Sequence, residues 1–454
     1  MRETGVVPME QPHFFLYLGF MPHKFFLYFI LLFAIGSLVL TATDAWHYTV
    51  QNGGVDLRCR TVASRLLAED KDPYFYKWVP SDGERLLDPN DTHDRIVNGN
   101  VVTPATLIIL TPLSKPAYPV IRIIWFMMQY LAIAAILLLL YRSESRKPLL
   151  LPFAIVVFGL LSAPTWLMHA ERGQIYIFYA LFAAIVYRLL KRPSPRSQFA
   201  SGFAGGLFIF FRPFAILLGA GMLFTGNRKW ITGAIAGILT GALLFVVPKP
   251  TAWQQYFAAM KEYQRIELKQ GTIPAQGNIP SIPEETEGAD NLKLTSEFNA
   301  HALKELNFYA TRYHIPYSTT QSTVLLLVVF SLLSIWFLLQ QKKRPFSADQ
   351  LFLFGYLLYF FAEYLMIAPR GPYNLVQWIV PLFIILRNRQ QQLLLMLTVI
   401  FALSLLMGLL FSHPYAMASG EIILCLVLLY SIFTREPINA SIWEKLHLTR
   451  PATG

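Results

Sequence analysis

The sequence predicts an all-α protein that crosses a membrane about twelve times and carries two large extracytoplasmic loops with short interfacial helices. Of its 454 residues, 55% are hydrophobic and 14% are charged, whereas a soluble chain has about 25% charged residues. Apolar runs near the length that a helix needs to cross a bilayer recur along the chain. The basic residues behind the net charge of +11 gather in the short gaps between these runs. This pattern favours membrane orientation over nucleic-acid binding.

Twelve spans are predicted from the apolar runs. The pieces 199–211 and 212–225 are short, and are either two helices broken at Arg212-Pro213 or one long span, which would give eleven. With twelve spans and the N-terminus inside, every basic gap is cytoplasmic, whereas eleven spans would place some of these gaps outside. The predicted spans are 25–42, 120–141, 149–166, 174–190, 199–211, 212–225, 230–247, 322–340, 349–367, 372–386, 391–411 and 419–434.

The domain organisation follows from these spans. The first apolar run, from Phe25, has no convincing cleavage site, so it is expected to be a retained helix. We expect a multi-pass protein of the bacterial cytoplasmic (inner) membrane, in contact with membrane lipids and without a nucleic-acid partner. The segments are a cytoplasmic 1–24, one transmembrane domain 25–434 with extracytoplasmic loops 43–118 and 248–320, and a cytoplasmic tail 435–454.

Asp56 is the candidate catalytic residue, because it stands where the chain leaves the first span. A helix from Leu57 would be amphipathic and would lie in the headgroup plane. A carboxylate at the membrane surface could act as a general base, but Asp after Gly-Gly is also a common helix N-cap, and the spacing alone favours the cap. The arginines that follow could equally hold a phosphate or contact lipid headgroups; they are Arg58, Arg60 and Arg65.

Further candidates for substrate binding are polar residues at junctions between spans or inside apolar runs. Ionisable groups in such runs are costly and therefore indicate a cavity or a partner. Glu363 and Arg370 could instead pair with each other. We find no metal-ligand spacing and no Gly-rich phosphate loop, so neither a metal nor a cofactor is expected. The candidates are Arg58, Arg60, His169, Glu171, Arg172, Gln174, Arg212, Glu363, Arg370, Tyr373, Asn374 and Gln377.

Several stretches together resemble glycosyltransferase family 87. DLRCRTVASRLLAEDKDPYFY resembles the family's "D-x-x-x-Y…A…L-x-x-G-x-x-P-Y" opening, and PYNLVQWIVPLFIIL resembles its late "H-Y…P" segment, without the histidine. HAERGQIYIFYALFAAIVYRLLKR and GFAGGLFIFFRPFAILL resemble its "GQ…L…A…R" and "G…G-x-A…K-P" run. In this resemblance, which extends over about residues 25–390, Asp56 matches the catalytic acid and Gln174 the glutamine of "GQ". Arg212 stands where the family often has lysine.

The resemblance implies a C-type membrane glycosyltransferase. The donor would be a polyprenyl-phosphate sugar, mannose or a similar hexose or pentose, and the acceptor an extracytoplasmic glycan or glycolipid. Asp56 would deprotonate the acceptor with inversion at the sugar, and Arg172, Arg212 and Arg370 would stabilise the leaving phosphate. The alternative is a transporter or flippase of lipid-linked sugars, for which paired halves would be expected. The sequence shows no such internal symmetry.

Overall fold

The computed structural model describes residues 23–51, 53–90, 100–142, 161, 164–267, 319–343, 345–365, 372–388 and 425–432. Throughout these ranges the regular structure is helical, without a strand. The chain is therefore an α-helical protein, as predicted. Several predictions fall outside the described residues: Arg370, the span 391–411, most of the span 149–166 and the loop residues 268–318.

The helices have the following bounds in chain order. They are α1 (His23–Gln51), α2 (Val55–Ala68), η2 (Pro80–Asp82), η3 (Glu84–Leu86), α3 (Pro104–Leu110), α4 (Tyr118–Arg142), α6 (Pro164–Arg172), α7 (Tyr176–Leu190), α8 (Pro195–Phe208), η4 (Pro213–Gly219), α9 (Ala220–Phe224), α10 (Arg228–Gly241), the π-turn η5 (Ala242–Val246), α11 (Pro250–Glu267), α14 (Thr319–Lys343), α15 (Ala348–Leu365), η6 (Pro372–Trp378) and α16 (Ile379–Asn388). Residues 425–432 are also helical.

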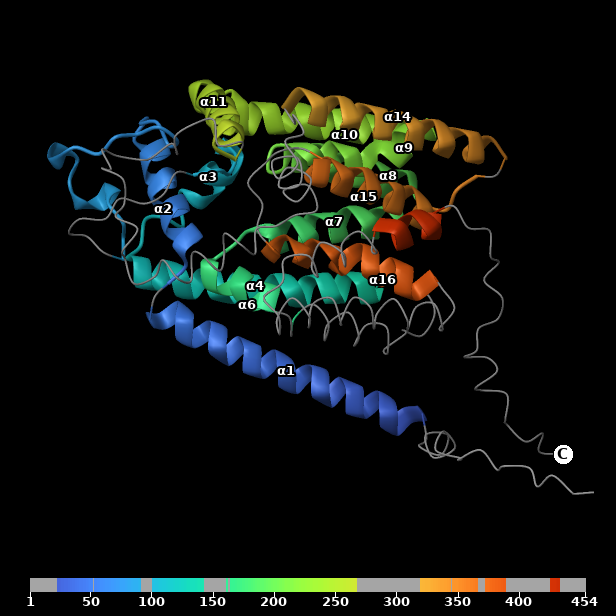
Figure 1. Ribbon diagram of the computed structural model, residues 1–454, viewed down its shortest axis with the longest axis horizontal. Coiled ribbons are helices and arrows are strands. Elements are labelled where there is room, and N and C mark those ends of the chain that lie inside the picture. The colour runs from blue at the N-terminus through green and yellow to red at the C-terminus, as the bar shows by residue number, and fades with distance from the viewer. Residues whose placement is uncertain are drawn as a thin grey trace, which may run out of the picture.

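The long helices run side by side, and the short helices α2 and α3 stand across one end of them (Figure 1). We call this end the α2 end. The C-terminal end of α1 reaches the same place, so the chain enters α2 directly from the end of its first long helix (Figure 1). The arrangement gathers the residues around Asp56 at one end of an apolar bundle.

Three helices among the described residues are long and apolar enough to cross a membrane by themselves: Tyr118–Arg142, Arg228–Val246 and Thr323–Lys343. The pair Trp166–Arg172 and Tyr176–Leu190 passes the same test jointly, but its two arms are bent by 113°. The bend is made at Gly173, whose φ of 67° lies in the left-handed region that favours glycine. The total of twelve spans stays a prediction.

The chain breaks at Arg212-Pro213, as the first of the two alternatives predicted. Arg212 is extended (φ −142°, ψ 98°), and the 3₁₀ helix η4 begins at Pro213. Proline has no N–H to continue the helical ladder and disfavours a helical residue before it. The break leaves the Arg212 side chain free to turn away from the helix axis.

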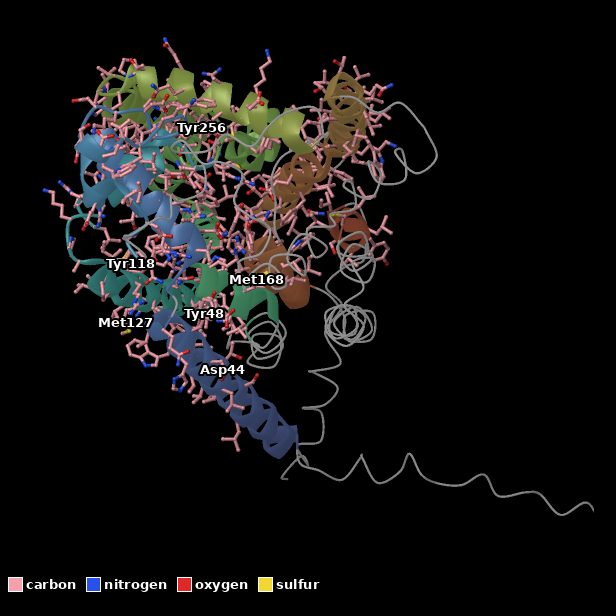
Figure 2. The ribbon with its side chains drawn as sticks, turned by 60° about the vertical axis from the view of Figure 1, so that its left-hand side comes forward. Asp44, Tyr48, Tyr118, Met127, Met168 and Tyr256 are labelled. Atoms are coloured by element: carbon pink, nitrogen blue, oxygen red, sulfur yellow. The ribbon has the colours of Figure 1, made fainter. Side chains whose placement is uncertain are left out.

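Residues at the start of the loop 248–320 pack against the loop 43–118. The Lys249 Nζ, just before α11, donates to the carbonyl of Leu67 at 2.9 Å and also binds Asp70. The rings of Tyr74 and Tyr256 lie 5.8 Å apart, and Figure 2 shows Tyr256 on α11 at the α2 end. These contacts fix α2 against the second loop.

Two predictions for α2 are wrong. Its N-cap is Gly54, and Asp56 lies in the first turn without capping the helix. The face expected to meet headgroups consists of Arg58, Thr61, Ser64 and Arg65, and it is buried except for Arg58, which is partly exposed. The physical reason is that this polar face packs against other polar groups of the protein, which replace water as hydrogen-bond partners.

Candidate active site

Asp56 lies where α2 meets the bend between α6 and α7. Its Oδ2 accepts a hydrogen bond from Arg172 Nε at 2.6 Å, and its Oδ1 accepts one from Arg172 Nη2 at 3.3 Å. Gln174 Nε2 also donates to Oδ2. The side chains of Asp56 and Arg172 are each 21% exposed, so the carboxylate is held on one side and stays open on another. This combination suits a group that must meet a substrate.

The turn before Asp56 is held in place by a side chain from α4. Tyr118, at the start of α4, donates its hydroxyl to the carbonyl of Gly53 at 2.6 Å. Gly53 and Gly54 both have φ near 50°, a conformation that glycine adopts at little cost. Figure 2 shows Tyr118 on α4 and Tyr48 on α1.

The environment keeps Asp56 ionised. Burial by itself would raise the pKa of the carboxyl, but the charges of Arg172 and Arg60 and the hydrogen bonds from Arg172 and Gln174 outweigh it and lower the pKa. A carboxylate with a lowered pKa is negatively charged at neutral pH. It can therefore accept a proton, although it holds that proton weakly.

The three arginines of α2 are all engaged by groups of the protein. Arg58 pairs with Asp88 at 2.8 Å, and Arg65 donates from Nε to the carbonyl of Ser114 at 3.0 Å. Arg60 donates from Nη1 to the carbonyl of Gly173 at 2.8 Å and from Nη2 to Gln174 Oε1 at 2.7 Å. Of the three, Arg60 alone touches the residues that hold Asp56.

A second charged cluster is formed by Arg212 and Glu363. Arg212 Nε donates to Glu363 Oε1 at 3.0 Å and lies 3.3 Å from the hydroxyl of Tyr359. That hydroxyl donates to Gln377 Oε1 at 2.6 Å. The structure thus pairs Glu363 with Arg212, whereas the sequence had suggested Arg370. The break at Pro213 is what lets Arg212 reach α15.

Two tyrosines connect the clusters. The ring centroids of Tyr176 and Tyr373 are 5.6 Å apart. Arg172 lies over the Tyr373 ring at 5.8 Å, and Arg212 lies over the Tyr176 ring at 5.5 Å. Guanidinium groups over aromatic faces are favourable. The two cationic residues therefore flank one aromatic surface, which is formed by α7 and η6.

The remaining predicted residues lie around these clusters. His169 is fully buried, stacks on Trp166 and accepts the backbone N–H of Ile177 at 3.2 Å, which fastens the bend. Glu171 is half-buried and interacts electrostatically with the negative charge of Asp44. The amide of Asn374 is buried, and in the described part of the chain it has no hydrogen-bond partner.

Sequence reasoning missed Tyr176 and Tyr359. A signal for each was present, because Tyr359 stands four residues before Glu363, on the same helix face, and Tyr176 follows Gln174 by two residues. In a chain with 22 tyrosines, that signal is weak. Within the described residues, no group of three His, Cys, Asp or Glu side chains could hold a metal ion.

The comparisons with known proteins give one match. Residues 102–369, more than half of the chain, match the model of glycosyltransferase family 87. No curated protein and no solved structure matches. The matched region contains Arg172, Gln174, Arg212 and Glu363 but begins after Asp56, which is tied to it by the contacts described above. The chain therefore belongs to glycosyltransferase family 87 and is a membrane glycosyltransferase.

Proposed function

We propose that this enzyme moves a single sugar, mannose or a similar hexose or pentose, from a polyprenyl-phosphate donor to a glycan or glycolipid acceptor. The reaction takes place on the extracytoplasmic side of a bacterial inner membrane, with inversion at the anomeric carbon. Asp56 is the general base. The observation that carries the proposal is the ionised, partly open carboxylate of Asp56, held by Arg172 and Gln174 from the family-matched region.

In the proposed step the acceptor hydroxyl oxygen attacks the anomeric carbon as the bond from that carbon to the donor phosphate oxygen breaks. The hydroxyl proton passes to Asp56, and the bonding electrons leave with the phosphate. Because the lowered pKa makes Asp56 a weak base, the proton moves late, when the acceptor oxygen is already bonding to carbon and has become acidic. Until then the carboxylate orients the hydroxyl by accepting its hydrogen bond.

The charges around Asp56 support a donor with a single phosphate. Arg60 and Arg172 carry two positive charges against the one negative charge of Asp56, which leaves one positive charge in excess. The Arg212–Glu363 pair is neutral. A sugar phosphodiester carries one negative charge, and a second develops on its phosphate as the bond breaks. Arg172 and Arg212, on either side of the tyrosine surface, are the described cations that would stabilise it, and Arg370 is a third candidate.

The polar groups beyond the tyrosine surface suit the sugar. Gln377 is buried beside Tyr359, and its Nε2 has no hydrogen-bond partner among the described residues. Buried polar groups normally have partners. We therefore assign Tyr373, Asn374, Gln377 and Glu363 to the sugar hydroxyls, and His169 and Glu171 to the wall of the same site.

The test is sugar transfer by purified Asp56→Asn protein with polyprenyl-phosphate mannose, glucose and arabinose as donors. This variant keeps the shape of the side chain but cannot accept the proton, so we expect transfer to fall by about 10²- to 10⁴-fold. The matched control is Asp82→Asn, which removes another ion-paired and mostly buried carboxylate, one that binds Lys71 outside the candidate site. Transfer at the wild-type rate by Asp56→Asn would refute the assignment of the base.

A further inference from the structure

We infer that Arg60 is a positioning residue that fixes the orientation of the Gln174 amide and through it the hydrogen bonding of Asp56. This inference rests on the proposed function, in which Asp56 is the base. It differs from the expectation that Arg60 binds substrate. Hydrogen bonds run from Arg60 on α2 to Gly173 and Gln174 at the α6–α7 bend, and from Gln174 back to Asp56 on α2.

The chemistry of the three groups leaves Gln174 only one orientation. A guanidinium has donors and no acceptor, and a carboxylate has acceptors and no donor. An amide between them must turn its oxygen to Arg60 and its nitrogen to Asp56, which is the arrangement found: Arg60 Nη2 donates to Gln174 Oε1 at 2.7 Å, and Gln174 Nε2 donates to Asp56. If the amide were reversed, its oxygen would face a carboxylate oxygen of Asp56, and its NH2 group would face the N–H donors of Arg60.

Arg60 is itself held in place, so it can serve as the fixed point of this chain. It is 4% exposed, and its Nη1 donates to the carbonyl of Gly173 at 2.8 Å. That carbonyl belongs to the residue that makes the bend between α6 and α7. Two of the three guanidinium nitrogens are thus occupied by groups of the protein, which hold the guanidinium in one place.

Without Arg60, Gln174 would lose its preference between the two amide orientations, which have nearly the same shape. Asp56 would then lose one of the donors that stabilise its charged form, and the charge of Arg60 as well. The carboxyl would take up a proton at a higher pH than in the wild type. Because the charge of Arg60 lowers the pKa of Asp56 by itself, the positioning role is distinguished by whether the effect of removing Arg60 depends on Gln174.

The test compares Arg60→Met, Gln174→Leu and the double variant, as full-length protein in lipid vesicles, by kcat, donor KM and the pH dependence of kcat/KM. Arg60→Met should lower kcat by about 10-fold, as expected for loss of a residue that orients a catalytic group. It should move the acidic limb of the profile to higher pH and leave donor KM within about two-fold. On the Gln174→Leu background it should cause little further loss, and Arg60→Lys should restore part of the rate.

A second measurement needs no catalysis. Thermal unfolding midpoints of the same three variants in detergent form a double-mutant cycle. If Arg60 holds Gln174 in the folded protein, the midpoint of the double variant falls by clearly less than the sum of the two single shifts. The matched control is Arg65→Met, a buried arginine of the same helix bound to Ser114 and Arg85. It should lower the midpoint additively with Gln174→Leu and leave the acidic limb in place.

The outcomes distinguish a failure of the positioning role of Arg60 from a failure of the proposed base, Asp56. Additive shifts in the unfolding midpoints for Arg60→Met and Gln174→Leu, or an increase in donor KM with an unchanged acidic limb, would overturn the positioning role. Full transfer by Asp56→Asn, together with non-additive midpoints, would overturn the base assignment while the contact between Arg60 and Gln174 stands.

Discussion

At the residue scale, the partners of Asp56 determine both its charge and its affinity for a proton. Its contacts with Arg172 and Gln174 keep it charged and fix its direction, and the same contacts weaken its affinity for a proton. A stronger base would require a higher pKa and would be partly protonated in mildly acidic surroundings. In the proposed reaction, this pairing would keep the carboxylate ionised before the acceptor binds and would make the proton transfer late.

Replacing Arg172 by Gln should make the activity more sensitive to acid. Arg172 is the strongest of the favourable influences that hold the pKa of Asp56 below its ordinary value, so its loss raises that pKa. The ionised fraction at about pH 5 then falls, while at about pH 8 the carboxyl stays ionised. We expect the acidic limb of kcat/KM to shift upward, measured from about pH 4.5 to 8.5. Arg85→Gln, an exposed arginine paired with Glu69, is the control. An unshifted limb would contradict the electrostatic account.

Replacing Arg212 by Lys should weaken donor binding. Lysine keeps the charge, and so avoids leaving Glu363 as an unpaired buried carboxylate, but it cannot donate from two nitrogens in a fixed plane or lie flat over Tyr176. We expect the donor KM to rise about 10-fold, the size of a lost hydrogen bond to a charged group. Donor-dependence curves at saturating acceptor would show it. An unchanged donor KM with a lowered unfolding midpoint would mean that the pair with Glu363 serves only the fold.

At the scale of elements, helices α8 and α10 approach each other so closely that their backbones touch. A Cβ on Gly206 would lie 2.2 Å from the carbonyl oxygen of Ala234, and one on Gly237 would lie 2.2 Å from that of Phe203. Small residues at such crossings let helices associate in a membrane, where apolar burial gives little driving force. This contact sets the course of α8 and hence the place of Arg212, which follows it.

Gly206→Ala should therefore destabilise the protein, and Gly205→Ala should not. The added methyl group at Gly206 meets a backbone carbonyl, which cannot move without separating the helices, and overpacking of this kind costs about 1–3 kcal/mol. At Gly205 the nearest atom, on the Trp230 ring, lies at 3.5 Å, an ordinary contact, and alanine is the better helix former. Unfolding midpoints in detergent compare the two variants. Equal midpoints would contradict the close approach of α8 and α10.

At the scale of the whole molecule, α7 connects two polar regions at opposite ends of the bundle. At the N-terminal end of α7, the residues of the α6–α7 bend contact Asp56. Towards its end, Tyr187 donates to Asp349 at 2.9 Å and Lys191 pairs with the same carboxylate at 3.0 Å, which joins α7 to α15. Asp349 thus fixes α7 against the helix that also carries Glu363. Asp349 therefore links the helix that begins beside Asp56 to the helix that carries Glu363.

The predicted topology places the α2 end outside and the basic gaps inside. A cysteine introduced at Thr272, in the loop 248–320, should react with a membrane-impermeant maleimide on intact cells, and one at Lys343 should react only after permeabilisation. The native cysteines give a low background because both are buried, and burial raises the pKa of the Cys59 thiol to about 12. Labelling in the opposite pattern would invert the orientation and place the site on the cytoplasmic side.

The sequence by itself determined the helical membrane class and most of the polar groups that form the candidate site, and it offered the break at Arg212-Pro213 as one of two alternatives. These features follow from local patterns, since apolar runs, proline and ionisable residues in apolar surroundings act on their own neighbourhood in the chain.

Only the tertiary structure decided which groups pair. Asp56 and Arg172 are 116 residues apart, and Arg212 and Glu363 are 151 apart. From local spacing, the sequence therefore offered Asp56 as a helix cap as well as a base, and offered nearby Arg370 as a partner for Glu363. It also left open whether the arginines of α2 hold a phosphate or contact lipid headgroups, because a helical pattern shows which face is polar but not whether that face meets water or the polar groups of another helix. The packing of α2 against the α6–α7 bend decides that this face is buried. A buried charge is stable only where distant parts of the chain supply its partners.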